Sequence, residues 1–183
     1  MSIKRSISIL TASIVGLASS IAITTPAKSE SQYRFTCRQM GSVWTTVAQT
    51  PRGDRPYIQW TSDFGGFAGY SREDRCKQVS ARLDSYVREQ SPLYLTHGRH
   101  ENGYPIICRT NFEGRGCSGN DMVYTIDPNG TQTAQDVLKQ LLRLSGNDFK
   151  DPVPVFASSC RLYVNVRQHL QEQPSASFAC SPR

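Results

Sequence analysis

Six cysteines constrain the fold of this chain more than any other feature of its sequence. All of them lie after residue 36, and their number is even. In an exported chain this pattern is typical of disulfide bonds. Sequence alone cannot fix the pairing, but separation and expected structure favour three pairs, each stabilising the fold by about 2–4 kcal/mol. The favoured pairs are Cys37 with Cys76, Cys108 with Cys117, and Cys160 with Cys180.

The N-terminal 29 residues have the three zones of a secretory signal peptide. Lys4 and Arg5 form the basic start, residues 7–23 carry no charge, and Ala27 and Ser29 supply the small residues of a cleavage site. The alternative is a retained membrane anchor, because the apolar run of seventeen residues lies at the lower edge of the roughly 17–25 that span a bilayer. Both interpretations predict export, and they differ in whether the segment is cut away or kept.

Cleavage after Ser29 leaves 154 residues, which suffices for one domain with a hydrophobic core. Three of the 21 Lys and Arg residues lie in the removed segment, so 18 remain against 15 Asp and Glu, a net charge of +3. The basic residues are scattered, which argues against nucleic acid as a partner. We expect a core domain at residues 30–150 and a C-terminal extension at residues 151–183, tied down by Cys160 and Cys180.

The pattern of apolar residues predicts a disulfide-stapled α+β fold. Its sheet is mostly antiparallel, and two main helices pack on one face. We expect strands at residues 33–38, 43–50, 56–61, 93–96, 104–109, 121–126 and 161–166, helices at residues 71–91 and 133–144, and a tail at residues 171–183.

Two details of this pattern concern which way side chains face. Alternation within the third strand predicts that Tyr57 faces away from Ile58. Helical spacing in the first helix predicts that Arg75 and Asp84 lie on its solvent side. Ser71, with Asp74 three residues later, is typical of the start of this helix.

A single compact cluster of titratable residues stands out in the sequence. His97, His100 and Glu101 offer ligand types that a metal ion accepts. The segment is, however, predicted to form the end of a hairpin, and it lacks the helix of zinc-protease motifs. We therefore expect no metal ion and no other cofactor. No G-x-S-x-G motif is present, and an even cysteine count argues against a free catalytic thiol.

Aromatic residues are concentrated in the first third of the chain. Core packing accounts for most of them, but Phe64, Phe67 and Tyr70 lie in or beside a glycine-rich loop. Any of these three that stays exposed is a candidate for a binding surface.

Several short motifs follow one another in a set order along the chain. They are R-F-T-C at 34–37, T-V-A at 46–48, P-Y-I-Q-W at 56–60, D-R-C-K-Q-V-S-A-R at 74–82, L-Y-L-T-H-G at 93–98, P-I-I-C at 105–108, the cysteine at 117 and M-V-Y-T-I at 122–126. In this order they resemble the circadian oscillating protein family of cyanobacteria. The resemblance covers about residues 33–145 and implies an exported or peripherally membrane-associated protein of a photosynthetic bacterium. It implies no enzyme activity and no catalytic residues.

Taken together, these features predict an exported, non-enzymatic structural or binding protein of the cell envelope or another extracytoplasmic compartment. The candidate partners are an envelope protein and a membrane surface. The alternative is an exported enzyme of unrecognised type that uses His97, His100 and Glu101.

Overall fold

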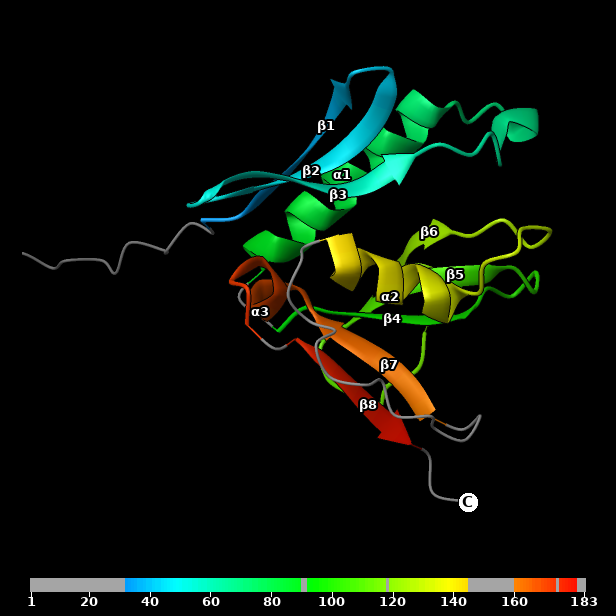
Figure 1. Cartoon of the computed structure of the whole chain (residues 1–183). Coiled ribbons are helices and arrows are strands. Elements are labelled where there is room, and N and C mark those ends of the chain that lie inside the picture. The colour runs from blue at the N-terminus through cyan, green and yellow to red at the C-terminus, as the bar shows by residue number, and fades with distance from the viewer. Residues whose placement is uncertain (1–31, 90–91, 118, 145–159, 174, 181–183) are drawn as a thin grey trace, which may run out of the picture.

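The computed structural model describes residues 32–89, 92–117, 119–144, 160–173 and 175–180 (Figure 1). The predicted signal peptide lies outside these residues. No helix in the described part of the chain is both long enough and apolar enough to cross a membrane.

Three antiparallel strands form the first sheet, in the order β1 (Arg34–Met40), β2 (Val43–Thr50) and β3 (Gly53–Trp60). Helix α1 (Arg72–Arg88) packs against this sheet. Ser71 and Asp74 form the predicted capping box at its N-terminus, which satisfies backbone N–H groups that have no partner within the helix. The apolar side of α1 buries Cys76, Val79, Leu83 and Val87.

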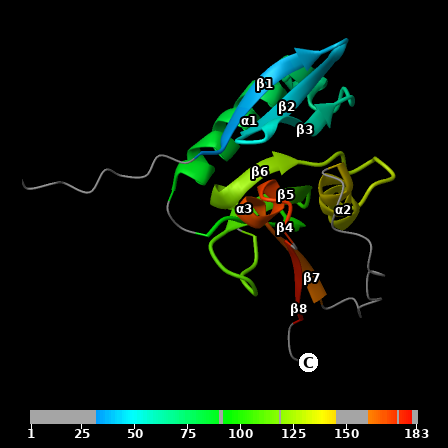
Figure 2. The same ribbon diagram turned by 60° about the vertical axis from the view of Figure 1, so that its left-hand side comes forward.

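Five antiparallel strands form the second sheet, in the spatial order β6 (Met122–Thr125), β5 (Pro105–Thr110), β4 (Tyr94–Arg99), β7 (Cys160–Asn165) and β8 (Ala176–Cys180). Helix α2 (Ala134–Leu144) packs against this sheet and also contacts β3 of the first sheet. Figures 1 and 2 show α2 beside the five-stranded sheet, with the three-stranded sheet and α1 on the other side of the molecule. The short elements are η1 (Gly66–Ala68), η2 (Gly119–Asp121) and α3 (Val166–Leu170).

The α+β class and the antiparallel strands of the prediction are confirmed. The strands divide into two sheets, each with its own main helix, where the sequence predicts one sheet that carries both. A single hydrophobic core nevertheless joins them, because buried residues of both sheets and both helices belong to one cluster.

The C-terminal residues take part in the second sheet. Leu162 and Val164 of β7 are fully buried in the common core, and β7 pairs with β4. The prediction of a tail from residue 171 is wrong for the last strand, because β8 pairs with β7 over Ala176–Cys180. That segment is short and rich in small residues, so its strand conformation depends on its neighbour.

The disulfides join Cys37 with Cys76, Cys108 with Cys117, and Cys160 with Cys180, the three pairs that the sequence favours. The first links β1 to α1, and the last links β7 to β8. No described cysteine is free. Three disulfides indicate an oxidising, extracytoplasmic compartment.

Helical spacing predicts that Asp84 lies on the solvent side of α1. In the structure Asp84 is buried, with 7% of its surface exposed. Strand β1 covers it: Arg34 Nε donates to Asp84 Oδ1 at 2.8 Å, and the backbone N–H of Phe35 donates to the same oxygen at 3.0 Å. Arg88, one turn along α1, also donates to this carboxylate. Asp84 therefore ties the helix to the sheet.

Both strands that border the space between the sheets contain a β-bulge. In β3, Pro56 and Ile58 lie opposite consecutive residues of β2, so Tyr57 is the extra residue. In β6, Met122 and Tyr124 lie opposite consecutive residues of β5, so Val123 is the extra residue. A bulge adds one residue to one strand of a pair and re-aims the side chains beside it.

Candidate functional site

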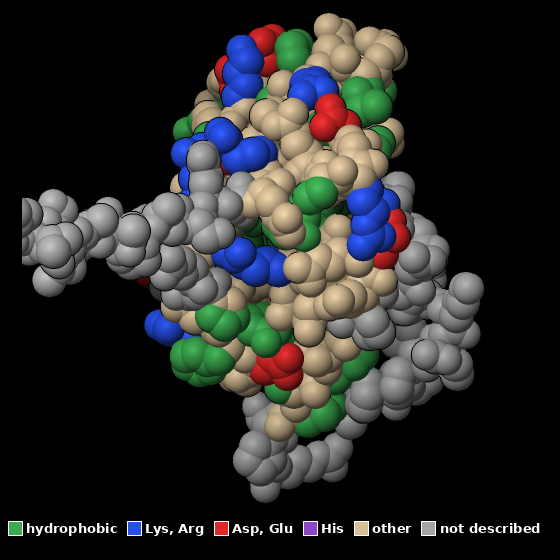
Figure 3. Space-filling model, turned by 90° about the vertical axis from the view of Figure 1, so that its left-hand side faces the viewer, with side chains coloured by type: hydrophobic (Ala, Val, Ile, Leu, Met, Phe, Trp, Pro, Cys, Tyr) green, Lys and Arg blue, Asp and Glu red, His purple; other side chains and the backbone are tan. Residues whose placement is uncertain are grey.

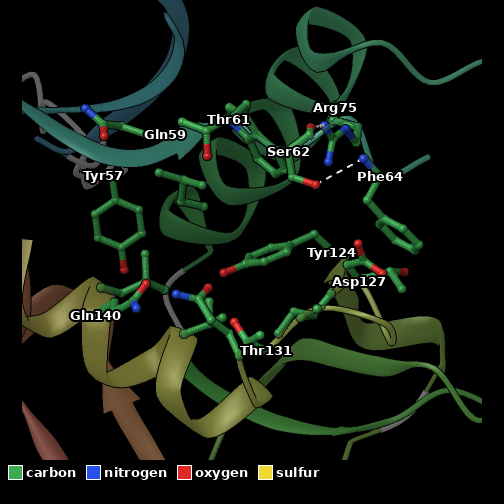
Figure 4. Close-up of a pocket in the computed structure, with 18 residues that line it drawn as sticks. Tyr57, Gln59, Thr61, Ser62, Phe64, Arg75, Tyr124, Asp127, Thr131 and Gln140 are labelled. Atoms are coloured by element: carbon green, nitrogen blue, oxygen red, sulfur yellow. Dashed lines mark hydrogen bonds between the residues drawn. The ribbon is translucent and has the colours of Figure 1, made fainter. Parts of the chain in front are cut away.

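A pocket of about 560 Å³ lies between β3, β6 and α2 (Figure 4). This volume falls in the range of roughly 300–1,000 Å³ typical of sites for small organic molecules. Its apolar wall includes Ile58, Trp60, Ile126 and Leu141, all of them buried. The two sheets come together around this pocket. Residues of β3, β6 and α2, which are far apart in the sequence, therefore face one another across it.

Tyr57 and Tyr124 carry the two phenolic hydroxyls of this pocket, and Figure 4 shows both pointing into it. Each hydroxyl oxygen is shielded from solvent and has no hydrogen-bond partner among the described residues. Burial raises the pKa of Tyr57, and burial followed by the charge of Tyr57 raises the pKa of Tyr124. Both groups therefore remain protonated at neutral pH.

The bulge in β3 explains the position of Tyr57. Without it, Tyr57 and Ile58 would face opposite sides of the sheet, as the alternation of the strand predicts. The prediction is wrong: Tyr57 packs on Phe35, which pairs with Ala48, and this face of the sheet also carries Thr46 and its partner Ile58. The ring of Tyr57 packs edge-on to Phe35 of β1, with ring centroids 5.1 Å apart.

Arg75, in the first turn of α1, also departs from its predicted solvent position and lines the pocket. Its guanidinium lies over the ring of Trp60, 5.4 Å from the ring centroid, and it donates a hydrogen bond to the carbonyl oxygen of Ser62. Its Nε–H is shielded and has no partner within the described structure. Burial lowers the pKa of Arg75, although nearby Asp63 opposes this shift.

Trp60 is held in place from two sides. Its indole Nε1 donates to Thr46 Oγ1 at 3.0 Å, and Ser80 Oγ of α1 lies 3.0 Å from the same oxygen. On the other side its ring meets the ring of Tyr124 edge-on, with centroids 5.7 Å apart. The central wall of the pocket is therefore preorganised by polar contacts within the core.

The charge of the lining is small and balanced. Arg75 supplies one positive charge and Asp127 one negative charge, and no Lys, His, Cys or Glu side chain lines the pocket in the described part of the chain.

Of the aromatic residues singled out in the sequence, Phe64 lines the pocket and Phe67 lies beside it. Phe64 makes edge-on contacts with Phe67 and with Tyr104, at centroid distances of 6.1 and 6.2 Å. Phe67 is 82% exposed, and Tyr70 is about half exposed, at 49%. The glycine-rich loop therefore presents aromatic surface at one end of the pocket.

The structure does not bring His97, His100 and Glu101 together as a site. His97 lies within β4, opposite Ile107, whereas the other two occupy the turn that follows. Among the described residues, no group of three or more His, Cys, Asp or Glu could hold a metal ion. Burial, and then the positive charges of Arg161 and Lys139, lower the pKa of His97.

The arginines of α1 have individual partners. Arg72 pairs with Asp63, Arg82 donates to the carbonyl of Val123, and Arg88 pairs with Asp84. On the face shown in Figure 3, basic side chains lie in separate groups with acidic side chains beside several of them. The helix thus carries no continuous basic surface on its described residues.

The sequence does not mark Tyr57, Tyr124 or Arg75 as site residues. The aromatic bias of the first third of the chain included Tyr57, but the pocket depends on two bulges and on the approach of two sheets. Neither leaves a local signature in the sequence.

Comparison with known proteins identifies one family. The sequence model described as circadian oscillating protein COP23 matches residues 34–171. The match extends past the limit of about residue 145 expected from the motifs, and it includes β7 and α3. No curated protein and no solved structure matches the chain.

Proposed function

The chain belongs to the circadian oscillating protein COP23 family, and from this premise we propose that it is a non-enzymatic, extracytoplasmic binding protein for a small organic molecule. The proposed binding site is the pocket between β3, β6 and α2. Residues 1–29 direct export and are removed, and the domain works in the cell envelope or another exported compartment.

The observation that carries this proposal is the pair of phenolic hydroxyls of Tyr57 and Tyr124. A shielded polar group without a partner costs about 1–3 kcal/mol of folding free energy. Proteins rarely leave such groups unpaired, and here two of them come from different sheets and enter one pocket. A ligand that hydrogen-bonds to both would offset this cost.

Binding is favoured over catalysis by the chemistry of the lining. The raised pKa values keep both phenols protonated at neutral pH, so neither serves there as a general base. Asp127 Oδ1 already accepts a hydrogen bond from the backbone N–H of Asn129 at 2.9 Å. Two neutral phenols set in an aromatic and aliphatic wall are suited to holding a molecule by hydrogen bonds and apolar contact.

The test uses the full chain exported into an oxidising compartment and purified without reductant. Intact mass with and without reductant should differ by about six daltons, two hydrogens for each of the three disulfides. Native mass spectrometry of the same material should detect a small organic molecule that is lost when the protein is unfolded.

The matched variants are Tyr57→Phe and Tyr124→Phe, which remove one hydroxyl each, with Tyr94→Phe as the control outside the pocket. We expect the first two to reduce the fraction of protein with bound molecule and the control to retain it. Equal retention in all three would place the molecule elsewhere and contradict the proposal.

A further inference from the structure

The unpartnered groups in the pocket share one chemical property, which is that each can donate a hydrogen bond. The Nε–H of Arg75 has no accepting lone pair and can only donate. The hydroxyls of Tyr57 and Tyr124 stay protonated, so each keeps its O–H. A molecule that satisfies all three groups must therefore present an oxygen or nitrogen acceptor to Arg75, and acceptors at the tyrosine end satisfy both O–H groups as well.

The donors lie at two places along the pocket. Figure 4 shows Tyr57 at one end and Arg75 with Phe64 at the other, while the ring of Tyr124 extends between them with its hydroxyl directed towards the Tyr57 side. A ligand that reaches both places needs acceptors on opposite edges.

The body of the ligand lies between these two places, where the pocket is formed by rings and aliphatic side chains. The rings of Trp60 and Tyr124 meet at an interplanar angle of 76°, and Ile58 and Leu141 complete the wall. A flat, unsaturated molecule can lie on the face of one of these rings, and a well-placed ring pair adds about 0.5–1.5 kcal/mol beyond burial.

The charges of the lining distinguish a neutral ligand from an anion. Arg75 alone would favour a carboxylate, but Asp127 lies at the same end of the pocket (Figure 4). Asp63 also acts electrostatically on Arg75. An anion would lose its hydration and meet both positive and negative charge, so an uncharged acceptor is favoured.

Building on the proposed function, we infer that the ligand is an uncharged, flat, conjugated or aromatic compound with oxygen acceptors on opposite edges. Its oxygens accept hydrogen bonds from the two tyrosine hydroxyls at one end and from Arg75 Nε–H at the other. Its ring system packs against Trp60 and Tyr124.

Three probe molecules of similar size test this ligand class on the unchanged, exported protein. Chromone is a flat bicyclic compound with a ketone and an ether oxygen on opposite edges. Naphthalene has the same flat shape without acceptors, and chromone-2-carboxylate adds one negative charge. Titrations followed by ¹H–¹⁵N NMR give each dissociation constant, and the Arg75 Nε–H and Trp60 Nε1–H signals report directly from the pocket.

We expect chromone to bind about tenfold more tightly than naphthalene, the gain of one to two well-formed hydrogen bonds. Chromone should move the Arg75 Nε–H signal, and the carboxylate should bind no more tightly than chromone. In the double variant Tyr57→Phe/Tyr124→Phe, the affinity of chromone should fall towards that of naphthalene, with only the Arg75 hydrogen bond left to separate them. The affinity of naphthalene itself should not change.

The contrary outcomes separate the two proposals. Equal affinity for chromone and naphthalene would retain the pocket as a binding site and overturn the acceptor class, and tighter binding of the carboxylate would do the same. If none of the three probes shifts the Trp60 signal, both the ligand class and the proposed function are overturned. The comparison of probes uses the unchanged protein, so it does not depend on how the double variant folds.

Discussion

Tyr57 and Tyr124 place their hydroxyls in one pocket although they belong to different sheets, and each lies at or next to the bulge of an edge strand. The bulges of both strands therefore help to shape the pocket that the two side chains line. Four predictions follow from this arrangement and from the contacts around it.

The first prediction concerns the hydroxyls of the ligand-free protein. Tyr57→Phe removes a shielded, unpartnered oxygen and keeps the ring contact with Phe35. We expect the free energy of unfolding to be unchanged or to rise by about 1 kcal/mol, because a desolvation cost disappears. Urea denaturation of the ligand-free protein measures this change. A loss of more than about 1 kcal/mol would mean that the hydroxyl is hydrogen-bonded in solution.

The second prediction concerns Asp84. Asp84→Asn weakens the contact with Arg34, because the amide carries no charge. We expect a loss of about 2 kcal/mol of stability at pH 7, within the range for charged hydrogen bonds, measured by urea denaturation. Asp63→Asn is the control, since Asp63 pairs with Arg72 on the exposed surface and surface pairs contribute little.

The effect of Asp84 should also depend on pH. Burial raises its pKa, but hydrogen bonds from Arg34, Arg88 and the Phe35 amide outweigh burial and lower the pKa below the usual 3.8. As pH falls, Asp84 is therefore protonated at a higher pH in the unfolded chain than in the folded protein. Its stabilising contribution is complete above pH 3.8 and is lost as pH falls through the lower native value. The stability difference between the natural protein and Asp84→Asn should accordingly shrink in acid; a constant difference down to about pH 2 would contradict this.

The third prediction concerns the close approach of β4 to a disulfide. A Cβ atom on Gly98 would lie 2.6 Å from Cys117 Cβ and 2.8 Å from its sulfur. Gly98→Ala should therefore destabilise the fold by about 1–3 kcal/mol, as overpacking does. Gly66→Ala is the matched control, because no atom lies within 4 Å of its added Cβ. Thermal unfolding under non-reducing conditions gives the midpoint temperature of each variant. Equal midpoint temperatures for Gly98→Ala and Gly66→Ala would contradict the close contact.

The fourth prediction concerns His97. Because burial and then the charges of Arg161 and Lys139 lower its pKa below 6.5, the unfolded chain is protonated first as pH falls. The stability associated with neutral His97 is present above pH 6.5 and decreases as pH drops towards the native pKa. His97→Gln should lack this decrease. An NMR titration should also show a higher His97 pKa in Lys139→Gln than in the natural protein. An unchanged pKa would show that Lys139 does not contribute to lowering it.

The sequence predicted those parts of the fold that depend on local patterns. The capping box at Ser71 and Asp74 and the strands up to residue 126 follow from short-range spacing and turn residues. The three disulfides also followed, because each favoured pair joins segments that the expected elements bring near one another.

The parts that the sequence could not predict depend on contacts between distant segments. Asp84 has the spacing of a solvent-facing residue, and its burial is compensated by Arg34 and the Phe35 N–H of β1 together with Arg88. Strand alternation alone would place Tyr57 on the opposite face from Ile58, but the bulge in β3 directs it to the same side. Strand β8 acquires its conformation from β7. The pocket depends on the bulges and on the approach of the two sheets, so the candidate site was less predictable than the fold.

The bulges in β3 and β6 also bear on how the folded chain behaves towards copies of itself. A regular, exposed strand edge presents an unbroken row of N–H and C=O groups onto which another strand can add, the usual first step of aggregation. Here the extra residue at Tyr57 and at Val123 interrupts that row on one edge of each sheet. A protein built largely of antiparallel strands thus gains, from the same backbone irregularity that opens its pocket, protection against growing edge to edge into larger assemblies.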